Sequence, residues 1–296
     1  MQLQRQTIAS FDGTPIGIQM AGPEDAPVLL LANGLGATVE AYRFILDRFP
    51  RAFRYVSWDY RGMHASARPV RGYASLSVED HAQDALAVLD AVGAREAHVL
   101  AWSMGVQVVL ELYRTAGERF ETLVLHNGVP GKTWDTLGVP GLVRRAMDPL
   151  LKATQRADGL VESMLARAVD WPRFIDVAVR AGIVHHDVDR VAFTQVAQGF
   201  KELDMHLYLE VMRQLARHDA SDVLARITCP ALVIQGTEDR LTPLSVAQRM
   251  AREIPGARLA LLPGGTHWAA AEMPALINEH LEEFWRVAGV DVQGAM

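Results

Sequence analysis

The chain has 296 residues and a net charge of −6 at neutral pH, and half of its residues are apolar. This length is long for one minimal domain and short for two independent ones, and the apolar content suffices for a large core. The acidic balance argues against nucleic acid as a partner, because nucleic-acid phosphates require basic patches.

Two further features of the sequence indicate the cellular compartment in which the protein is expected. Cys229 is the only cysteine, so no intramolecular disulfide can form. Residues 1–6 lack the apolar core of a signal peptide, and no segment approaches the roughly 18 apolar residues of a membrane span. We therefore expect a cytoplasmic protein without a membrane span.

The predicted elements begin with two strands, at 4–9 and 16–20, on either side of the hairpin signal Asp12-Gly13. Strands and helices then alternate, a pattern that predicts a parallel sheet with right-handed crossovers. Ser77 with Asp80 predicts a helix cap. Further strands are expected at 28–32, 53–58, 96–101, 122–126, 231–235 and 258–262. Helices are expected at 39–48, 78–92, 104–113, 244–253 and 275–287.

The alternation stops between residue 130 and about residue 226. This stretch contains no clear strand but several amphipathic helical segments. We therefore expect this stretch to form an all-helical insertion after the sixth strand. The helical segments are expected at 141–153, 160–168, 172–181, 188–200 and 202–216.

The most informative motif is Ala101-Trp102-Ser103-Met104-Gly105, between a predicted strand and a predicted helix. A serine with tiny residues at both second neighbours, at such a junction, is typical of a nucleophile elbow, which exposes the hydroxyl above the sheet. Ala101 stands where glycine is commoner, and alanine is the least costly replacement. A serine at a helix start can also be a simple N-cap, so the motif needs supporting residues.

Two supporting residues follow in the required order. A serine of this kind needs a base and an acid that orients the base, arriving later in the chain as Ser, then Asp or Glu, then His. Asp239 follows the predicted strand 231–235, and His267 follows the strand 258–262. Ser103, Asp239 and His267 are thus expected at the carboxyl ends of three strands, where open α/β sheets place their chemistry.

The loop Asn33-Gly34-Leu35-Gly36-Ala37 after the third strand supplies a fourth element. Attack on an ester places negative charge on the carbonyl oxygen, and backbone N–H groups must point at that charge. We expect one donor to be the amide of Met104, next after the serine. The other is expected from the glycine-bearing loop, at Leu35.

Together these segments resemble the α/β-hydrolase family over residues 6 to 286, including Trp58-Asp59-Tyr60-Arg61-Gly62, which is similar to the family's D-x-R-G loop. The resemblance implies a mostly parallel eight-stranded sheet flanked by helices. It also implies a core domain of residues 1–130 and 227–296 and a helical cap, or lid, of residues 131–226. Asn33 and His64 depart from the family pattern, which commonly has His and Gly there.

The acid and the base each have alternative candidate residues in the sequence. Glu238 is the rival of Asp239, whereas the second acid position of the family, after the sixth strand, holds Asn127 and no carboxylate. His98 within a strand and His280 on the last helix are no rivals of His267. Asp59 and Arg61 are expected to pin a loop through a buried ion pair.

The expected pocket is apolar. Trp102 and Trp268 flank the serine and the histidine, and Trp134 lies in the expected cap. The other large apolar residues of the cap must mostly pack the cap onto the sheet. These residues, which fall at helical spacings, are Met147, Met164, Met205, Met212, Trp171, Phe174 and Phe200.

His185-His186-Asp187 resembles a metal-ligand group, but adjacent histidines without a spaced His/Cys set more often form a solvated turn. No metal or cofactor is therefore expected.

A serine at the elbow excludes the haloalkane dehalogenases and epoxide hydrolases of the family as they usually occur, since those need a carboxylate nucleophile. The resemblance implies acyl chemistry, and the first choice is a carboxylesterase for small to medium, largely uncharged esters. Lactone hydrolysis and carbon–carbon bond hydrolysis use the same core residues. A non-catalytic small-molecule receptor or accessory protein on the same fold is the alternative from another class. The oligomeric state is left open.

Overall fold

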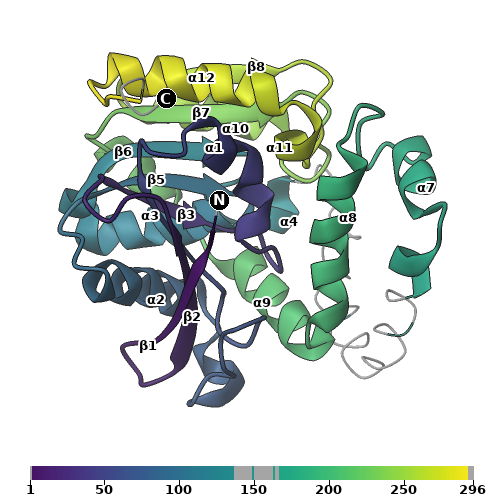
Figure 1. The fold of residues 1–296 in the computed structure, drawn as a ribbon, viewed down its shortest axis with the longest axis horizontal. Coiled ribbons are helices and arrows are strands. Elements are labelled where there is room, and N and C mark those ends of the chain that lie inside the picture. Colours follow the sequence, from purple (N-terminus) through teal and green to yellow (C-terminus); the bar gives the residue numbers. More distant parts are fainter. Residues whose placement is uncertain (1, 137–148, 150–162, 164–166, 293–296) are drawn as a thin grey trace.

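The computed structural model describes residues 2–136, 149, 163 and 167–292, and its described part is built on an eight-stranded sheet (Figure 1). The strand order is β1-β2-β4-β3-β5-β6-β7-β8, with antiparallel pairing for β1–β2 and β2–β4 and parallel pairing elsewhere. The mostly parallel sheet is confirmed. The strands are β1 (Gln4–Ala9), β2 (Pro15–Ala21), β3 (Val28–Ala32), β4 (Arg54–Trp58), β5 (Ala97–Trp102), β6 (Phe120–His126), β7 (Ala231–Gly236) and β8 (Arg258–Leu262).

Helices cover both faces of the sheet, and two apolar cores lie between helices and strands. Strands β3, β5 and β7 are buried along their whole length, which explains why their sequences are near-continuous apolar runs. One face carries α2 (Val78–Ala91), α3 (Met104–Ala116) and α10 (Leu244–Glu253). The other carries α1 (Arg43–Arg48), α11 (Ala269–Glu272) and α12 (Pro274–Val287).

Local signals account for several helix ends. Ser77 caps α2 through a capping box, in which Ser77 Oγ accepts from the Asp80 amide and the Asp80 carboxylate accepts from the Ser77 amide, as predicted. The helix expected at 39–48 is divided into a 3₁₀ turn, η1 (Val39–Tyr42), followed by α1. The short helix α11 was not predicted. Other 3₁₀ turns are η2 (Gly72–Ser75), η3 (Gly117–Arg119) and η5 (Ser221–Arg226).

The described part of the segment between β6 and β7 consists mainly of helices joined by turns and loops, and in Figure 1 its helices α7 and α8 lie beside the sheet. Asp189 and Asp204 cap α8 and α9 by accepting main-chain N–H groups, so both helices begin later than the sequence predicted. Most residues of the predicted helices 141–153 and 160–168 lie outside the described residues. The elements are α4 (Thr133–Thr136), α7 (Phe174–Arg180), α8 (Arg190–Gly199), η4 (Phe200–Glu202) and α9 (Met205–Arg217).

The two ends of this segment are held together where they leave and rejoin the core. Gly131 pairs with Asp219 in an antiparallel bridge, the Lys132 amide donates to the His218 carbonyl at 2.8 Å, and the Ala220 amide donates to Pro130 at 2.9 Å. Among the described residues, no helix has both the length and the apolar character needed to cross a bilayer.

The predicted ion pair between Asp59 and Arg61 is wrong. The buried Arg61 guanidinium pairs with Asp84 on α2, at 2.7 Å from Nε, and with Asp12 in the β1–β2 turn, at 3.1 Å. Asp59 instead accepts hydrogen bonds from Gln19 on β2 and from the Ala65 amide. Arg61 therefore has its acidic partners on elements that are distant in sequence.

Candidate active site

Ser103 lies in the turn between β5 and α3 with φ +56° and ψ −116°. A non-glycine residue in this region carries strain of about 1–3 kcal/mol and persists only where the surroundings enforce it. One such constraint is the close approach of α3 to β3, because a Cβ on Gly105 would lie 2.2 Å from the Ala32 carbonyl oxygen. The serine main chain is also held by its amide, which donates to the His126 carbonyl at 3.1 Å. The turn therefore lifts the serine off the sheet.

Three side chains from three strand ends form one continuous hydrogen-bonded chain. His267 Nε2 lies 2.9 Å from Ser103 Oγ, and His267 Nδ1 lies 2.8 Å from Asp239 Oδ2. Because the carboxylate can only accept, Nδ1 carries the proton and donates, which leaves Nε2 free to accept from the serine hydroxyl. The histidine is thus in the tautomer that can remove a proton from Ser103.

The Asp239 carboxylate is buried and held in one orientation. Its Oδ1 accepts from the amides of Leu241 and Thr242, and its Oδ2 accepts from the Thr242 hydroxyl as well as from His267. Burial by itself raises the pKa of the Asp239 carboxyl, but the His267 imidazole and the hydrogen bonds from His267 and Thr242 outweigh it and lower the pKa below its ordinary value. The neighbouring Glu238 is exposed at the surface.

The loop that carries His267 is clamped from several directions. The buried Glu272 carboxylate accepts from the Thr266 amide at 2.8 Å and from the Thr266 hydroxyl at 2.5 Å. The Trp102 indole N–H donates to the His267 carbonyl at 3.1 Å, which joins the serine strand to the histidine loop. The sequence did not predict a role for Glu272. This residue lies five positions after His267, and no motif or regular spacing connects the two.

The two expected backbone donors lie at the same pocket as the serine. Leu35, Met104 and Ser103 all line it. Met104 is the first residue of α3 and has no acceptor one turn earlier in the helix. Neither the Leu35 nor the Met104 amide donates a hydrogen bond within the described residues. Both N–H groups are therefore available to a ligand oxygen.

The two departures from the family pattern hold the loop that contains Leu35. Asn33 donates to the Trp58 carbonyl at 3.0 Å, and its own carbonyl accepts from the Tyr60 hydroxyl at 2.7 Å. A ring nitrogen of His64 lies 2.9 Å from the Gly36 carbonyl and must donate to it. The loop after β4 thus supports the Leu35 loop at both of its ends.

A pocket of about 940 Å³, including the part open to solvent, lies over Ser103 and His267. Trp102, Trp134 and Trp268 all line it. None of the described residues that line this pocket is an aspartate, glutamate, lysine or arginine. The segment between β6 and β7 also contributes Phe200, Tyr208, Met212 and Leu215. Met147 and Met164 lie outside the described residues.

The sequence profile of the alpha/beta hydrolase fold matches residues 27–274, which is most of the chain. The chain belongs to the α/β-hydrolase family. The eight-stranded sheet, flanked by helices on both faces, is the fold expected of such a protein.

Several members of the α/β-hydrolase family are similar to this chain along most of its length. A protein named as a carbamate hydrolase, RutD of Caulobacter sp. (strain K31), is 27% identical over 269 residues, covering 89% of this chain and 92% of its own. The 3-oxoadipate enol-lactonase 1 of Acinetobacter baylyi is 25% identical over 247 residues, covering 83% and 84%. The structure of a hydrolase from Pseudomonas aeruginosa has a TM-score of 0.77 and 26% identity, covering 95% and 98%.

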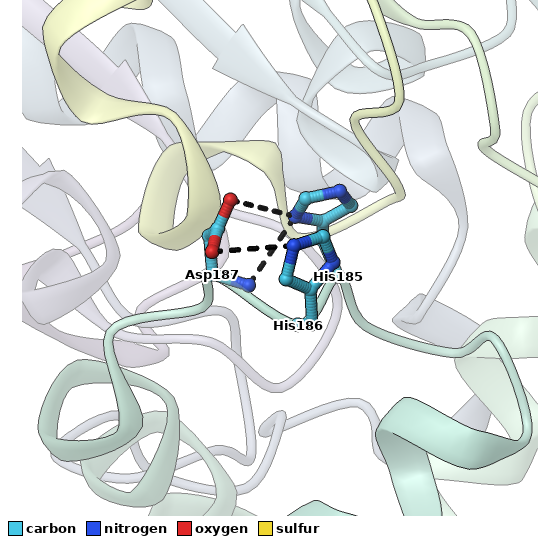
Figure 2. A group of neighbouring side chains, drawn as sticks. All are labelled: His185, His186 and Asp187. Carbon is cyan, nitrogen blue, oxygen red and sulfur yellow. Dashed lines mark hydrogen bonds and ion pairs between the residues drawn. The ribbon is translucent and has the colours of Figure 1, made fainter.

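This α/β-hydrolase chain also contains the group His185, His186 and Asp187 between α7 and α8 (Figure 2). The three candidate ligand atoms lie within 4.8 Å of one another. His185 Nδ1 already accepts from the Asp187 amide at 3.3 Å, and the side chains of His186 and Asp187 are 71% and 68% exposed. His186 and Asp187 thus lie in an exposed turn.

Proposed function

We propose that this chain is a serine hydrolase that cleaves carboxylic esters through an acyl-enzyme intermediate. The observation that carries the proposal is the hydrogen-bonded chain from Ser103 through His267 to Asp239, which opens into a pocket beside two amides that have no acceptor among the described residues. Acyl transfer needs a nucleophile, a base, an orienting acid and an oxyanion site, and each of these has a candidate residue here.

In the proposed reaction, Ser103 Oγ attacks the ester carbonyl carbon while its proton passes to His267 Nε2. Asp239 holds the imidazole in place and stabilises the cation that forms. The amides of Leu35 and Met104 donate to the oxyanion. Collapse of the tetrahedral intermediate releases the alcohol, which takes the proton from His267. Water then attacks the acyl-Ser103 ester by the same steps and releases the acid.

The pocket chemistry supports small to medium, largely uncharged substrates. Its lining is mainly apolar, and no charged side chain among the described residues could pair with a charged substrate. The Tyr208 hydroxyl has no hydrogen-bond partner within the described residues and can donate to a substrate oxygen. We further propose that residues 131–226 form a cap, since the described residues of this segment supply one wall of the pocket.

A second candidate is hydrolysis of a lactone or carbamate. It is favoured by the names of the two relatives, a carbamate hydrolase and an enol-lactonase, which match most of this chain. The same four groups would perform either reaction, because each begins with attack on a carbonyl carbon. A carbon–carbon bond hydrolase and a non-catalytic binding protein are further alternatives. The cytoplasmic location stays a prediction from the sequence.

The first experiment is hydrolysis of p-nitrophenyl esters, from acetyl to dodecanoyl, by the wild type and by Ser103→Ala. We expect turnover with a maximum at one chain length and a fall in kcat of about 10⁴-fold or more in the variant. A simple lactone and an N-unsubstituted carbamate, followed by acid and ammonia release, separate the second candidate. Substantial turnover by folded Ser103→Ala would refute the nucleophile, and silence of the wild type on every substrate would favour a binding role.

A further inference from the structure

Asn127 follows β6 directly and lies between the ends of β5 and β7, with only 1% of its surface exposed. Its φ is +43°, in the left-handed region that asparagine tolerates better than most residues. Its amide donates to the Ile234 carbonyl at 3.0 Å, so the main chain is tied to β7. The side chain therefore has a fixed origin beside the candidate active site.

The side chain of Asn127 bridges the two loops that carry Asp239 and His267. Its Oδ1 accepts from the amide of Gly236, the last residue of β7, at 2.8 Å. Its Nδ2 donates at 2.8 Å to the carbonyl of Thr266, the residue before His267. The partners define the amide orientation without ambiguity, because one can only donate and the other can only accept.

The bridge completes a clamp on Thr266. The Glu272 carboxylate accepts hydrogen bonds from the Thr266 amide and hydroxyl, and Asn127 Nδ2 donates to the Thr266 carbonyl. At the Oδ1 end of the Asn127 side chain, the loops that carry Asp239 and His267 pack tightly against each other. A Cβ on Gly236 would lie 2.4 Å from the Gly265 carbonyl oxygen. A carboxylate in place of Asn127 would face the Thr266 carbonyl with a second acceptor, so the site requires a group that both donates and accepts.

We propose that Asn127 is a positioning residue that holds the Asp239 and His267 loops in register. It does not touch substrate and acts through those two side chains. The inference rests on the proposed function, because register between the acid and the base matters only if they work together. The substrate pocket does not include Asn127, so its loss is expected to lower kcat and leave KM nearly unchanged.

The test uses Asn127→Gly and Asn127→Asp in the full chain. Glycine adopts a φ of +43° without strain, so the first variant removes the bridge and leaves the main chain free to keep its course. Aspartate keeps the acceptor for Gly236 but loses the donor to Thr266. The control is Asn278→Ala, which removes another amide-to-carbonyl bond, to Phe44, between α12 and α1.

We expect kcat for the best ester to fall by about 100-fold in both Asn127 variants, the effect of a misplacement of about 1 Å, with KM within about twofold. The control is expected to retain its kcat. If Asn127→Gly does not fold, Asn127→Asp decides in the same way. A folded variant with unchanged kcat would overturn the proposal, and so would an equal loss in the control.

A second readout needs no substrate. We expect the proton that His267 Nδ1 shares with Asp239 to give a low-field proton NMR signal, identified by its absence in His267→Gln. We expect this signal in the wild type, Ser103→Ala and Asn278→Ala, and its broadening or loss in both Asn127 variants. An unchanged signal in folded Asn127→Gly would overturn the positioning role. If the wild type shows the signal but cleaves no ester, the esterase proposal fails while the signal still decides the role of Asn127.

Discussion

At the scale of single residues, backbone strain gathers around the candidate site. Four non-glycine residues of the described chain have positive φ: His64, Ser103, Asn127 and Lys132. His64 holds the Leu35 loop, Ser103 is the proposed nucleophile, and Asn127 joins the acid and base loops. Lys132 lies where the segment between β6 and β7 leaves the core. Such strain is kept where the surrounding structure over-determines it, which is typical of functional loops.

The choice of acid can be tested by two isosteric changes next to each other. Asp239→Asn removes the carboxylate that orients His267, and we expect kcat to fall by about 10⁴-fold with little change in folding. Glu238→Gln is the matched control, because Glu238 is exposed, and it should retain near wild-type kcat. Steady-state kinetics on the best p-nitrophenyl ester measures both. The reverse ranking of the two variants would move the acid to Glu238.

At the scale of elements, Arg61 ties the loop after β4 to α2 and to the β1–β2 turn. Its side chain has no exposure, and Asp84, which it contacts through two nitrogens, is also fully buried. The Ser10 hydroxyl donates to the same carboxylate, and the Ser75 carbonyl accepts from Arg61. These contacts place the Asp59–Gly62 loop beside the Leu35 loop, which the same region supports through Tyr60 and His64.

Arg61→Ala should destabilise the fold strongly, because it leaves the Asp84 carboxylate buried without its charged partner. We expect the free energy of unfolding to fall by about 3–5 kcal/mol. Arg68→Ala is the control: Arg68 pairs with Asp204, but its side chain is 73% exposed, so the loss should be below about 1 kcal/mol. Urea unfolding followed by circular dichroism compares the two. Equal losses would show that the buried pair is no more important than the surface pair.

At the scale of the whole molecule, buried histidines make stability depend on pH. Burial lowers the pKa of His81 to about 3, of His98 to about 4 and of His126 to about 3. His81 is fully buried on α2, and neither of its ring nitrogens has a hydrogen-bond partner in the part of the chain that the structure describes. Below pH 6.5 the unfolded chain binds protons that the folded chain rejects, so the free energy of unfolding falls as the pH falls from 6.5 toward 3.

For His81 alone, a pKa of 6.5 in the unfolded chain and about 3 in the folded chain lowers the free energy of unfolding at pH 5 by about 2 kcal/mol relative to pH 8. His81→Leu should remove this part of the pH dependence and leave the fold intact at pH 8. The control His186→Gln changes a histidine whose side chain is 71% exposed and should preserve the slope. Urea unfolding at pH 5 and pH 8 measures both, and an unchanged slope in His81→Leu would contradict a neutral buried imidazole.

The sequence by itself determined the fold, the strand positions and the residues to examine. Strands such as β3 and β8 are short, mostly apolar runs between turn residues, and that signal is local, so their ends agree with prediction. The order of Ser103, Asp239 and His267 at strand ends was also readable, because parallel strands bring their carboxyl ends to one edge. Their catalytic roles stay proposals until the variants are measured.

Only the tertiary structure decided which polar groups meet. Arg61 pairs with Asp84 and Asp12 although Asp59 is nearer in sequence. Asn127, noted from the sequence only for lacking a carboxylate, bridges two loops that lie more than a hundred residues away along the chain. Hydrogen bonds between distant segments follow from the packing of strands and helices, and no periodicity or spacing in the sequence encodes them.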